Sequence, residues 1–289
     1  MPNEMTADLH THTNCSDGTD TPQQLLAKAK VAGLTTLGLT DHDTAAGWDE
    51  AALNVPAGMR ILPGAEFSTK HPAPDGTLVS VHLLGYLFDR NNAEIVAEWE
   101  RMSSERSNRG TRIVENLIDA DYPITLDRVR EIAGRTNIGR PHIARALVEA
   151  GSVDSVGEAF DGLLNDEGAH YVALQSLSLE NGIRMIDAAG GVPIIAHPRA
   201  RAASSLLTEE VLESLTKHGL KGIEVRHPDH DDAARTELTG IAIDLGLIQT
   251  GSSDYHGENK VLQLGQERTP DDVVEQIVAL GCTAPFTKQ

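Results

Sequence analysis

The feature that most constrains the fold is a series of short apolar runs that stop abruptly at polar or acidic residues. These runs occupy residues 7–10, 36–40, 60–63, 79–86, 192–196, 222–225 and 247–251. Each has the length of a buried strand. Segments with helical spacing separate most of them, such as residues 22–32, which have a proline in the first turn and a glycine after the end. This alternation of parallel strands and helices predicts an α/β barrel.

The alternation stops between about residues 94 and 176, where the apolar spacing is helical. The helices expected there cover residues 93–120, with a break into two near residues 108–110, then 126–133, 141–150 and 156–164. We therefore expect two domains. Residues 1–93 and 177–289 form the barrel, and residues 94–176 form an inserted helical subdomain.

Side chains that bind metals follow or lie within six of the seven runs. In a parallel barrel the carboxyl ends of all strands converge on one face, so residues far apart in sequence meet there. His10 and His12 lie on the same side of an extended segment. The candidate metal ligands are His10, His12, Asp17, His42, Glu66, His82, His197, Asp254 and His256.

This set is too large for one ion. Six imidazoles and three carboxylates predict two or three divalent ions, with Glu66 as a bridging ligand. The two cysteines, Cys15 and Cys282, are far apart and lack a Cys-x-x-Cys spacing, so the sequence does not suggest a thiolate zinc site. We expect Mn, Fe or Zn, with Mg as a further option. Glu66, His197 and Asp254 are the predicted catalytic residues, which position the ions and a hydroxide.

The charge of such a site indicates its substrate. Three divalent ions outweigh three carboxylates and a bridging hydroxide by about two positive charges, which a phosphate dianion neutralises. Bound ions also lower the pKa of water, so a hydroxide that bridges them attacks phosphorus and the protein supplies no nucleophile. The sequence therefore predicts a metal-dependent phosphoesterase.

The motifs that carry these residues resemble the polymerase and histidinol phosphatase (PHP) family. They are Asp-Leu-His-Thr-His at 8–12, Ser-Asp-Gly at 16–18, Thr-Asp-His-Asp at 40–43, Gly-Ala-Glu at 64–66, His-Leu-Leu-Gly at 82–85, Ala-His-Pro at 196–198 and Ser-Asp-Tyr-His at 253–256. The resemblance implies a distorted (β/α)7 barrel with three metal ions. It also implies one ion on His10, His12, Glu66 and Asp254, a second on Glu66, His82 and His197, and a third on Asp17, His42 and His256.

The insertion is similar to one PHP subgroup through Gly-Arg-Pro-His-Ile-Ala at 139–144. Members of that subgroup remove the 3′-phosphate from nucleoside 3′,5′-bisphosphates and trim short RNA from its 5′ end. The resemblance implies a small phosphorylated nucleotide as substrate and inorganic phosphate as product. In this interpretation the inserted subdomain recognises the substrate.

Several side chains are candidates for substrate binding. Arg140 precedes a helix that begins with Pro141, so its guanidinium and the helix amides are placed to bind a phosphate. Arg199, next to His197, is a second candidate. The set is Ser16, Arg140, His142 and Arg199. Glu224 is expected to support the ligands from within its strand, and the roles of His227 and His230 stay open.

Three alternative functions share these residues. A histidinol-phosphate phosphatase or other small-molecule phosphatase would use the same barrel, but the insertion with Arg140 and His142 disfavours it. An amidohydrolase would need a bridging lysine carbamate, and no lysine is so placed. A non-catalytic metal-binding accessory module is disfavoured by the complete ligand set.

The net charge and hydropathy limit the partners. A formal net charge of −19 repels the phosphate backbone, so no stable binding of duplex nucleic acid is expected. No run approaches the roughly 18 apolar residues of a membrane span. The first residues lack a signal peptide's basic and apolar segments. We therefore expect a cytoplasmic protein without a membrane partner.

Overall fold

The computed structural model describes residues 5–134, 137–165, 168–170, 172–200, 203 and 205–288. The chain divides into two compact units. The barrel unit comprises Met1–Val96 and Ser176–Gln289, and the helical unit comprises Ala97–Gln175.

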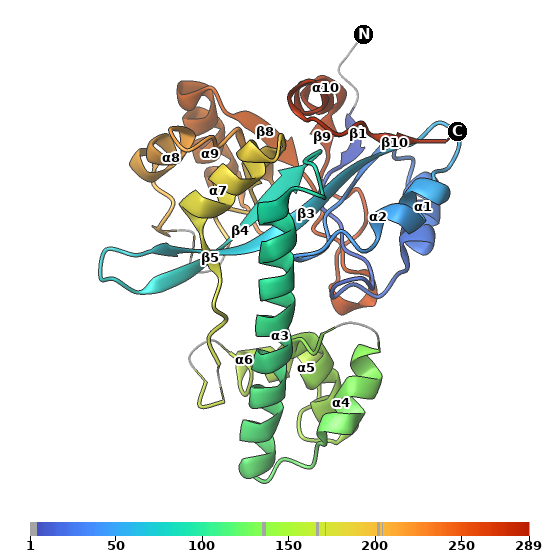
Figure 1. Cartoon of the computed structure of the whole chain (residues 1–289), viewed down its shortest axis with the longest axis vertical. Helices are drawn as coiled ribbons and strands as arrows, with labels where there is room; N and C mark the ends of the chain where they lie inside the picture. The colour runs from blue at the N-terminus through green and yellow to red at the C-terminus, as the bar shows by residue number, and fades with distance from the viewer. Residues whose placement is uncertain are drawn as a thin grey trace. The chain divides into compact units, whose positions relative to one another are not determined.

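The strands of the barrel unit form one strongly curved sheet (Figure 1). They are β1 (Met5–Asp8), β2 (Thr36–Leu39), β3 (Arg60–Pro72), β4 (Leu78–Tyr86), β5 (Leu177–Ser178), β6 (Val192–Ile195), β7 (Gly222–Arg226), β8 (Ile248–Gly251), β9 (Thr269–Pro270) and β10 (Phe286–Thr287). The hydrogen-bonded order is β8-β7-β6-β4-β3-β2-β1-β9, with β5 and β10 paired to β3. The buried Thr269 hydroxyl accepts from the Gly251 amide at 2.8 Å and donates to the Gly251 carbonyl at 2.7 Å. This side chain therefore joins β8 to β9, and the barrel is nearly closed.

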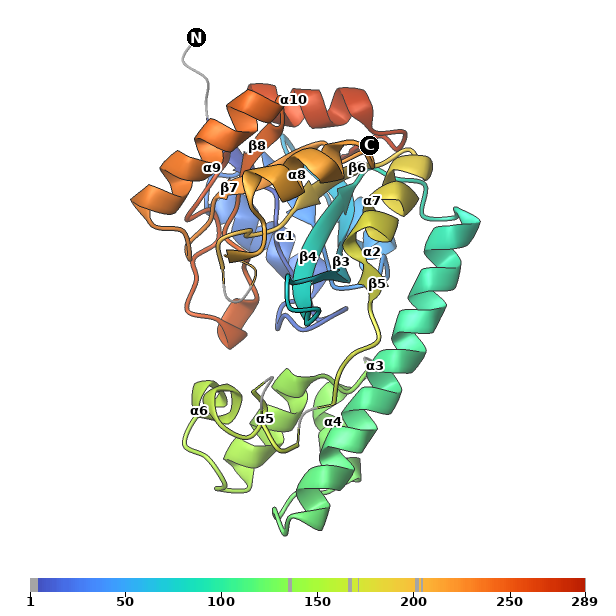
Figure 2. The same cartoon turned by 90° about the vertical axis from the view of Figure 1, so that its left-hand side faces the viewer.

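Helices cover the outside of the barrel (Figure 2). They are α1 (Pro22–Val31), α2 (Trp48–Leu53), α7 (Leu179–Ala188), α8 (Glu209–Thr216), α9 (Asp232–Leu245) and α10 (Asp271–Leu280). Thr21 caps α1 by accepting from the Gln24 amide at 3.2 Å, and Pro22 opens the helix. On α10, Val274 and Ile277 pack with Ala7 of β1 in a fully buried cluster. Burial of that apolar face fixes α10 against the barrel.

The sheet confirms the expected α/β barrel but not its uniform direction. β4 runs antiparallel to both β3 and β6, so the prediction that all strands are parallel is wrong for residues 79–86. Only residues 73–77 separate β3 from β4, and the Ala73 amide donates to the Thr77 carbonyl at 2.8 Å. A parallel crossover needs a dozen or more residues, so this connection can only be a hairpin. β3 also continues through Glu66 to Pro72 rather than ending at Pro63.

The helical unit is built from α3 (Ala93–Asp119), α4 (Leu126–Ala133), α5 (Arg140–Glu149) and α6 (Val156–Asp161), of which α3 begins in the barrel unit. The predicted break in α3 near residues 108–110 is wrong, because the helix is continuous over 27 residues. Gly110 allows Ile138 to pack closely against α3 and does not mark a turn, because a Cβ on it would lie 2.3 Å from the Ile138 carbonyl oxygen. None of the helices in the described ranges combines the length and apolarity needed to cross a bilayer.

Gly110→Ala is expected to lower the free energy of unfolding by about 1–3 kcal/mol, because the added methyl group overpacks the contact between α3 and Ile138. Gly240→Ala is the matched control. Gly240 also lies in a helix, but a Cβ there meets no atom within 4 Å, so the same change should stabilise by about 0.5–1 kcal/mol. Urea denaturation of both variants measures the two effects. Equal effects would contradict the close approach at Gly110.

Candidate metal centre

The buried carboxylate of Glu66 lies at the centre of five imidazoles. Glu66 is 1% exposed and lies within β3. Its Oε2 is 3.1 Å from His10 Nε2, 3.1 Å from His12 Nε2 and 3.2 Å from His42 Nδ1, and its Oε1 is 2.7 Å from His82 Nδ1 and 3.3 Å from His197 Nε2. Both oxygens thus face ring nitrogens, as expected for a carboxylate that bridges ions.

Two further carboxylates extend the cluster. Asp254 Oδ1 lies 3.5 Å from His10 Nε2 and 3.4 Å from His12 Nε2. Asp17 Oδ1 lies 3.3 Å from His256 Nε2. The ligand atoms form three groups, each within 4.8 Å: His10, His12, Glu66 and Asp254; His12, Asp17, His42 and His256; and His42, Glu66 and His82.

These groups correspond closely to the ion sets that the family resemblance implies. The first is the same. The Asp17 group additionally includes His12, and the third group holds His42 where His197 was expected. His197 nevertheless contacts Glu66, so all nine predicted ligands lie in one cluster.

The barrel brings these side chains together in two ways. Most ligands follow the carboxyl end of a parallel strand, whereas His82 lies inside antiparallel β4, opposite Ser68.

His197 and Asp254 have φ angles of 29° and 54°, in the left-handed region. Such backbone costs of order 1–3 kcal/mol per residue and persists where the surrounding structure enforces it. Here it turns both side chains toward the cluster.

Ring nitrogens in the cluster are buried without a hydrogen-bond partner in the described part of the chain. They include both nitrogens of His10 and His12 and the Nδ1 of His42. Each such nitrogen costs about 1–3 kcal/mol if left unsatisfied, and coordination to an ion would satisfy it. His256 Nδ1 donates to the Asp254 carbonyl at 2.8 Å, which leaves the Nε2 lone pair facing the cluster. The donor set therefore fits divalent cations.

The pKa shifts of the metal-free cluster distinguish its side chains. Burial raises the pKa of Glu66, but the positive charge of His10 holds it well below its ordinary value. Burial also raises the pKa of Asp254, which Lys260 and nearby imidazoles lower far more. Burial lowers the pKa of His42 to about 3. The carboxylates are thus ionised and His42 is neutral, which are the states that bind metal ions. Burial lowers the pKa of His10 and His12, but Glu66 and Asp254 raise it further, well above its ordinary value for His10 and to about 9 for His12. An ion that binds these two rings must therefore displace a proton from each.

A buried carboxylate behind the cluster, Glu224, orients two of the ligands. It lies in β7, is fully buried and accepts from the Ser252 hydroxyl. It also accepts from the His197 amide at 2.8 Å, and its Oε1 lies 3.4 Å from His10 Nδ1. A carboxylate on the far nitrogen fixes the tautomer of a ligating histidine.

Glu224→Ala is expected to lower the free energy of unfolding of the metal-free protein by at least about 2 kcal/mol, because the Ser252 hydroxyl and the His197 amide lose their buried acceptor. Glu224→Gln keeps an accepting oxygen and should cost less. Urea denaturation after chelation compares the two. An alanine variant within about 0.5 kcal/mol of the unsubstituted protein would argue against this orienting role.

Two other carboxylates that sequence reasoning missed hold the ligand loops. Asp8 accepts from the Ser253 amide at 3.0 Å and from the Ser253 hydroxyl at 2.6 Å. Asp41 accepts from the Thr13 amide at 2.8 Å. Both residues stand inside the ligand motifs, at 8–12 and 40–43. That proximity is the one signal that could have identified them.

The candidate substrate-binding residues of the barrel unit already have protein partners. Ser16 Oγ donates to Asp41 Oδ1 at 2.6 Å. Arg199 donates to both oxygens of Glu237, at 3.0 and 3.1 Å. His230 is a structural residue, because its Nε2 accepts from the Arg199 amide at 3.2 Å and its Nδ1 donates to a carbonyl.

The two candidates of the helical unit lie at the start of α5. His142 Nδ1 accepts from the Gly139 amide at 3.0 Å and thereby caps the helix. Arg140 Nη1 donates to the Leu164 carbonyl at 2.9 Å, and its guanidinium lies 5.5 Å from the centre of the Phe160 ring. Both side chains therefore also stabilise the helical unit itself.

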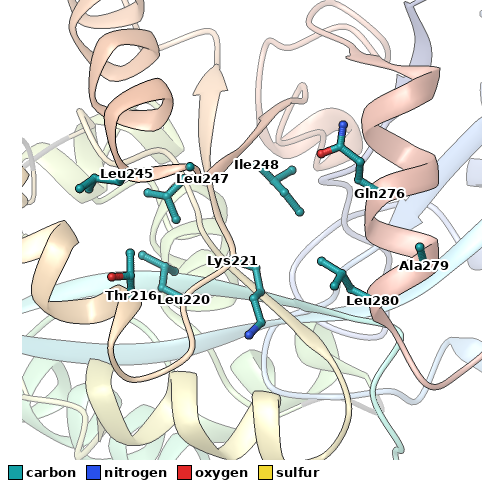
Figure 3. A pocket seen from close by; sticks show the side chains of 10 residues that line it. Thr216, Leu220, Lys221, Leu245, Leu247, Ile248, Gln276, Ala279 and Leu280 are labelled. Atoms are coloured by element: carbon teal, nitrogen blue, oxygen red, sulfur yellow. The ribbon is translucent and has the colours of Figure 1, made fainter.

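A cavity at the opposite end of the barrel differs from the cluster in its chemistry. It has a volume of about 450 Å³ and lies beside the starts of β7 and β8, and Figure 3 shows side chains that line it. The described residues that line it include Leu220, Lys221, Ile248 and Leu280, with no carboxylate or imidazole among them. Among the described residues, this cavity therefore offers no carboxylate or imidazole ligand for an ion.

Comparison with known proteins decides the family, since the PHP domain model matches residues 8–171. The chain belongs to the PHP family. A 5′-3′ exoribonuclease of Haemophilus influenzae is 29% identical over 94% of this PHP chain and 96% of the relative. A 3′,5′-nucleoside bisphosphate phosphatase of Chromobacterium violaceum is 31% identical over 86% of each.

A solved structure also resembles this PHP chain closely. A protein of Bifidobacterium adolescentis, assigned as a metal-dependent phosphoesterase, aligns with a TM-score of 0.87 and 36% identity over 97% of this chain and 98% of that one. The PHP protein described here is accordingly a metal-dependent phosphoesterase, which hydrolyses phosphoric esters.

Proposed function

We propose that this PHP protein removes the 3′-phosphate from nucleoside 3′,5′-bisphosphates and also acts on short 5′-phosphorylated RNA. The observation that carries the proposal is the cluster of nine ligands around Glu66, which presents a multiply charged cationic site to a phosphate once ions are bound. The names of the relatives in Haemophilus influenzae and Chromobacterium violaceum support a nucleotide or RNA as substrate.

The proposal assigns two or three ions of Mn, Fe or Zn to the cluster, with Mg as a further option. Bound ions would activate water and neutralise the phosphate. Glu66, His197 and Asp254 are the proposed catalytic residues. Their part is to hold the ions at fixed separations, which the left-handed backbone at His197 and Asp254 supports.

Ser16, Arg140, His142 and Arg199 remain the proposed substrate-binding residues. If Arg140 binds the second phosphate of the substrate, Arg140→Ala should raise KM for a bisphosphate by about 10-fold or more, the loss of one charge-assisted contact. The KM of the Arg140→Ala variant for a monophosphate should stay unchanged. Steady-state kinetics with both substrates decides this. Unchanged discrimination would restrict Arg140 to a structural role, to which its contacts with Leu164 and Phe160 contribute.

One assay tests the substrate class. With Mn(II) present, phosphate release is measured on adenosine 3′,5′-bisphosphate, 5′-AMP and histidinol phosphate, and release of 5′-mononucleotides is measured on a short 5′-phosphorylated RNA. The bisphosphate should have the highest kcat/KM. A preference for histidinol phosphate would replace the nucleotide assignment, and activity on none of the four would overturn it.

A further inference from the structure

The two oxygens of Asp254 face different partners. Oδ1 points to the ring nitrogens of His10 and His12, at 3.5 and 3.4 Å. Oδ2 accepts from the ammonium group of Lys260 and lies 3.6 Å from His227 Nε2. One oxygen thus belongs to the candidate metal centre, and the other faces two side chains that no ion set includes.

Lys260 cannot itself be a ligand, because an ammonium group has donors and no lone pair. It follows the short turn η2 (Gly257–Asn259), only six positions after Asp254. Its side chain is 30% exposed, whereas that of Asp254 is 8% exposed. The lysine therefore covers Asp254 from the solvent side.

His227 approaches the same oxygen from the interior. It is 1% exposed, and its Nδ1 accepts from the Asp229 amide at 3.1 Å. A ring nitrogen that accepts is unprotonated, so the proton of the neutral ring lies on Nε2. That nitrogen has no hydrogen-bond partner among the described residues and faces Asp254 Oδ2.

We propose that Lys260 and His227 are positioning residues that hold Asp254 so that Oδ1 alone is presented to the ion at His10, His12 and Glu66. With Oδ2 bound by the ammonium group of Lys260 and faced by His227 Nε2 at 3.6 Å, the carboxylate is restrained from turning to offer both oxygens. The left-handed backbone at Asp254, with φ at 54°, makes such restraint necessary. This inference rests on the proposed metal centre and deepens it.

The test uses the full chain after removal of metal by chelation. Binding of Mn(II) and Co(II) is measured by calorimetric titration, and the visible absorption of bound Co(II) reports the ligand geometry. The variants are Lys260→Met, Lys260→Arg, His227→Leu and His227→Gln. Lys221→Met is the matched control. Lys221 also pairs with an aspartate, Asp187, at 2.9 Å, and 34% of its side chain is exposed. It lines the cavity of Figure 3 rather than the metal centre.

Lys260→Met and His227→Leu should each weaken the binding of one ion by about 10–100-fold and change the Co(II) spectrum, as loss of an outer partner does. The other ions should bind as before. Lys260→Arg and His227→Gln keep a donor and should restore most of the affinity. Lys221→Met should have no effect.

Three results would overturn the inference. Unchanged affinity and spectrum in both variants would show that Asp254 needs no support. Uniform weakening of all ions with a lower melting temperature would show a role in folding only. A turnover defect of Lys260→Met that persists at saturating Mn(II), with normal ion binding, would place Lys260 on the substrate instead. Failure of the unsubstituted protein to bind any ion would overturn the proposed function itself.

Discussion

Glu66→Gln is expected to reduce kcat/KM by about 1,000-fold or more. The substitution keeps the size of the side chain but removes the charge that five imidazoles surround. A neutral amide bridges two cations poorly, so the ions lose both affinity and separation. A loss of about 4 kcal/mol of transition-state stabilisation corresponds to this factor.

Steady-state kinetics and metal analysis of the purified variant measure this effect. Glu275→Gln is the control, because Glu275 is an exposed carboxylate of the same unit that pairs with Arg60 at 2.7 Å. It should retain full activity. If Glu66→Gln kept more than a tenth of the activity with a full metal content, Glu66 would not be the bridging ligand.

Removal of the ions is expected to abolish activity and to lower thermal stability. Ions bound only by the folded state stabilise it by about 2.7 kcal/mol at 100 times their dissociation constant. For a chain of this size that corresponds to roughly 5–10 °C in melting temperature. The loss of contact between Glu66 and the ions leaves buried carboxylates and imidazoles without their shared cation.

Differential scanning fluorimetry before and after chelation, with readdition of Mn(II), Zn(II) or Mg(II), measures the shift. Activity and melting temperature should return together with the ion that the site prefers. A chelated protein that stayed fully active would exclude ions from the reaction, and the fold would then use the cluster for another purpose.

The ligand cluster could be predicted from sequence because each ligand stands beside a local signal. Apolar runs that end at His42, His197 or Asp254 report both the strand and the face to which its end points. The direction of β4 carried no such signal, because residues 79–86 are apolar whichever way the strand runs. The expected runs left residues 64–78 between them, which is long enough for a parallel crossover, and only the extension of β3 to Pro72 shortens the connection to residues 73–77.

Other features depend on contacts between residues far apart in the chain. Gly110 resembles a helix breaker until the packing of Ile138 against it is known. Glu224 looks like any other strand residue in the sequence. Its three partners, His197, Ser252 and His10, all lie at least 27 residues away along the chain. Periodicity cannot report such contacts, because it describes one element at a time.

The positions of Glu66 and His82 depend on the register in which β3 pairs antiparallel with β4. Glu66 pairs with Leu84 and His82 with Ser68, so both functional side chains are fixed by the same run of backbone hydrogen bonds. A slip of one residue would turn one of them to the opposite face of the sheet. We therefore expect insertions to be tolerated at the hairpin tip, residues 73–77, whereas a single deletion within either strand should disrupt the candidate metal centre without removing a candidate ligand.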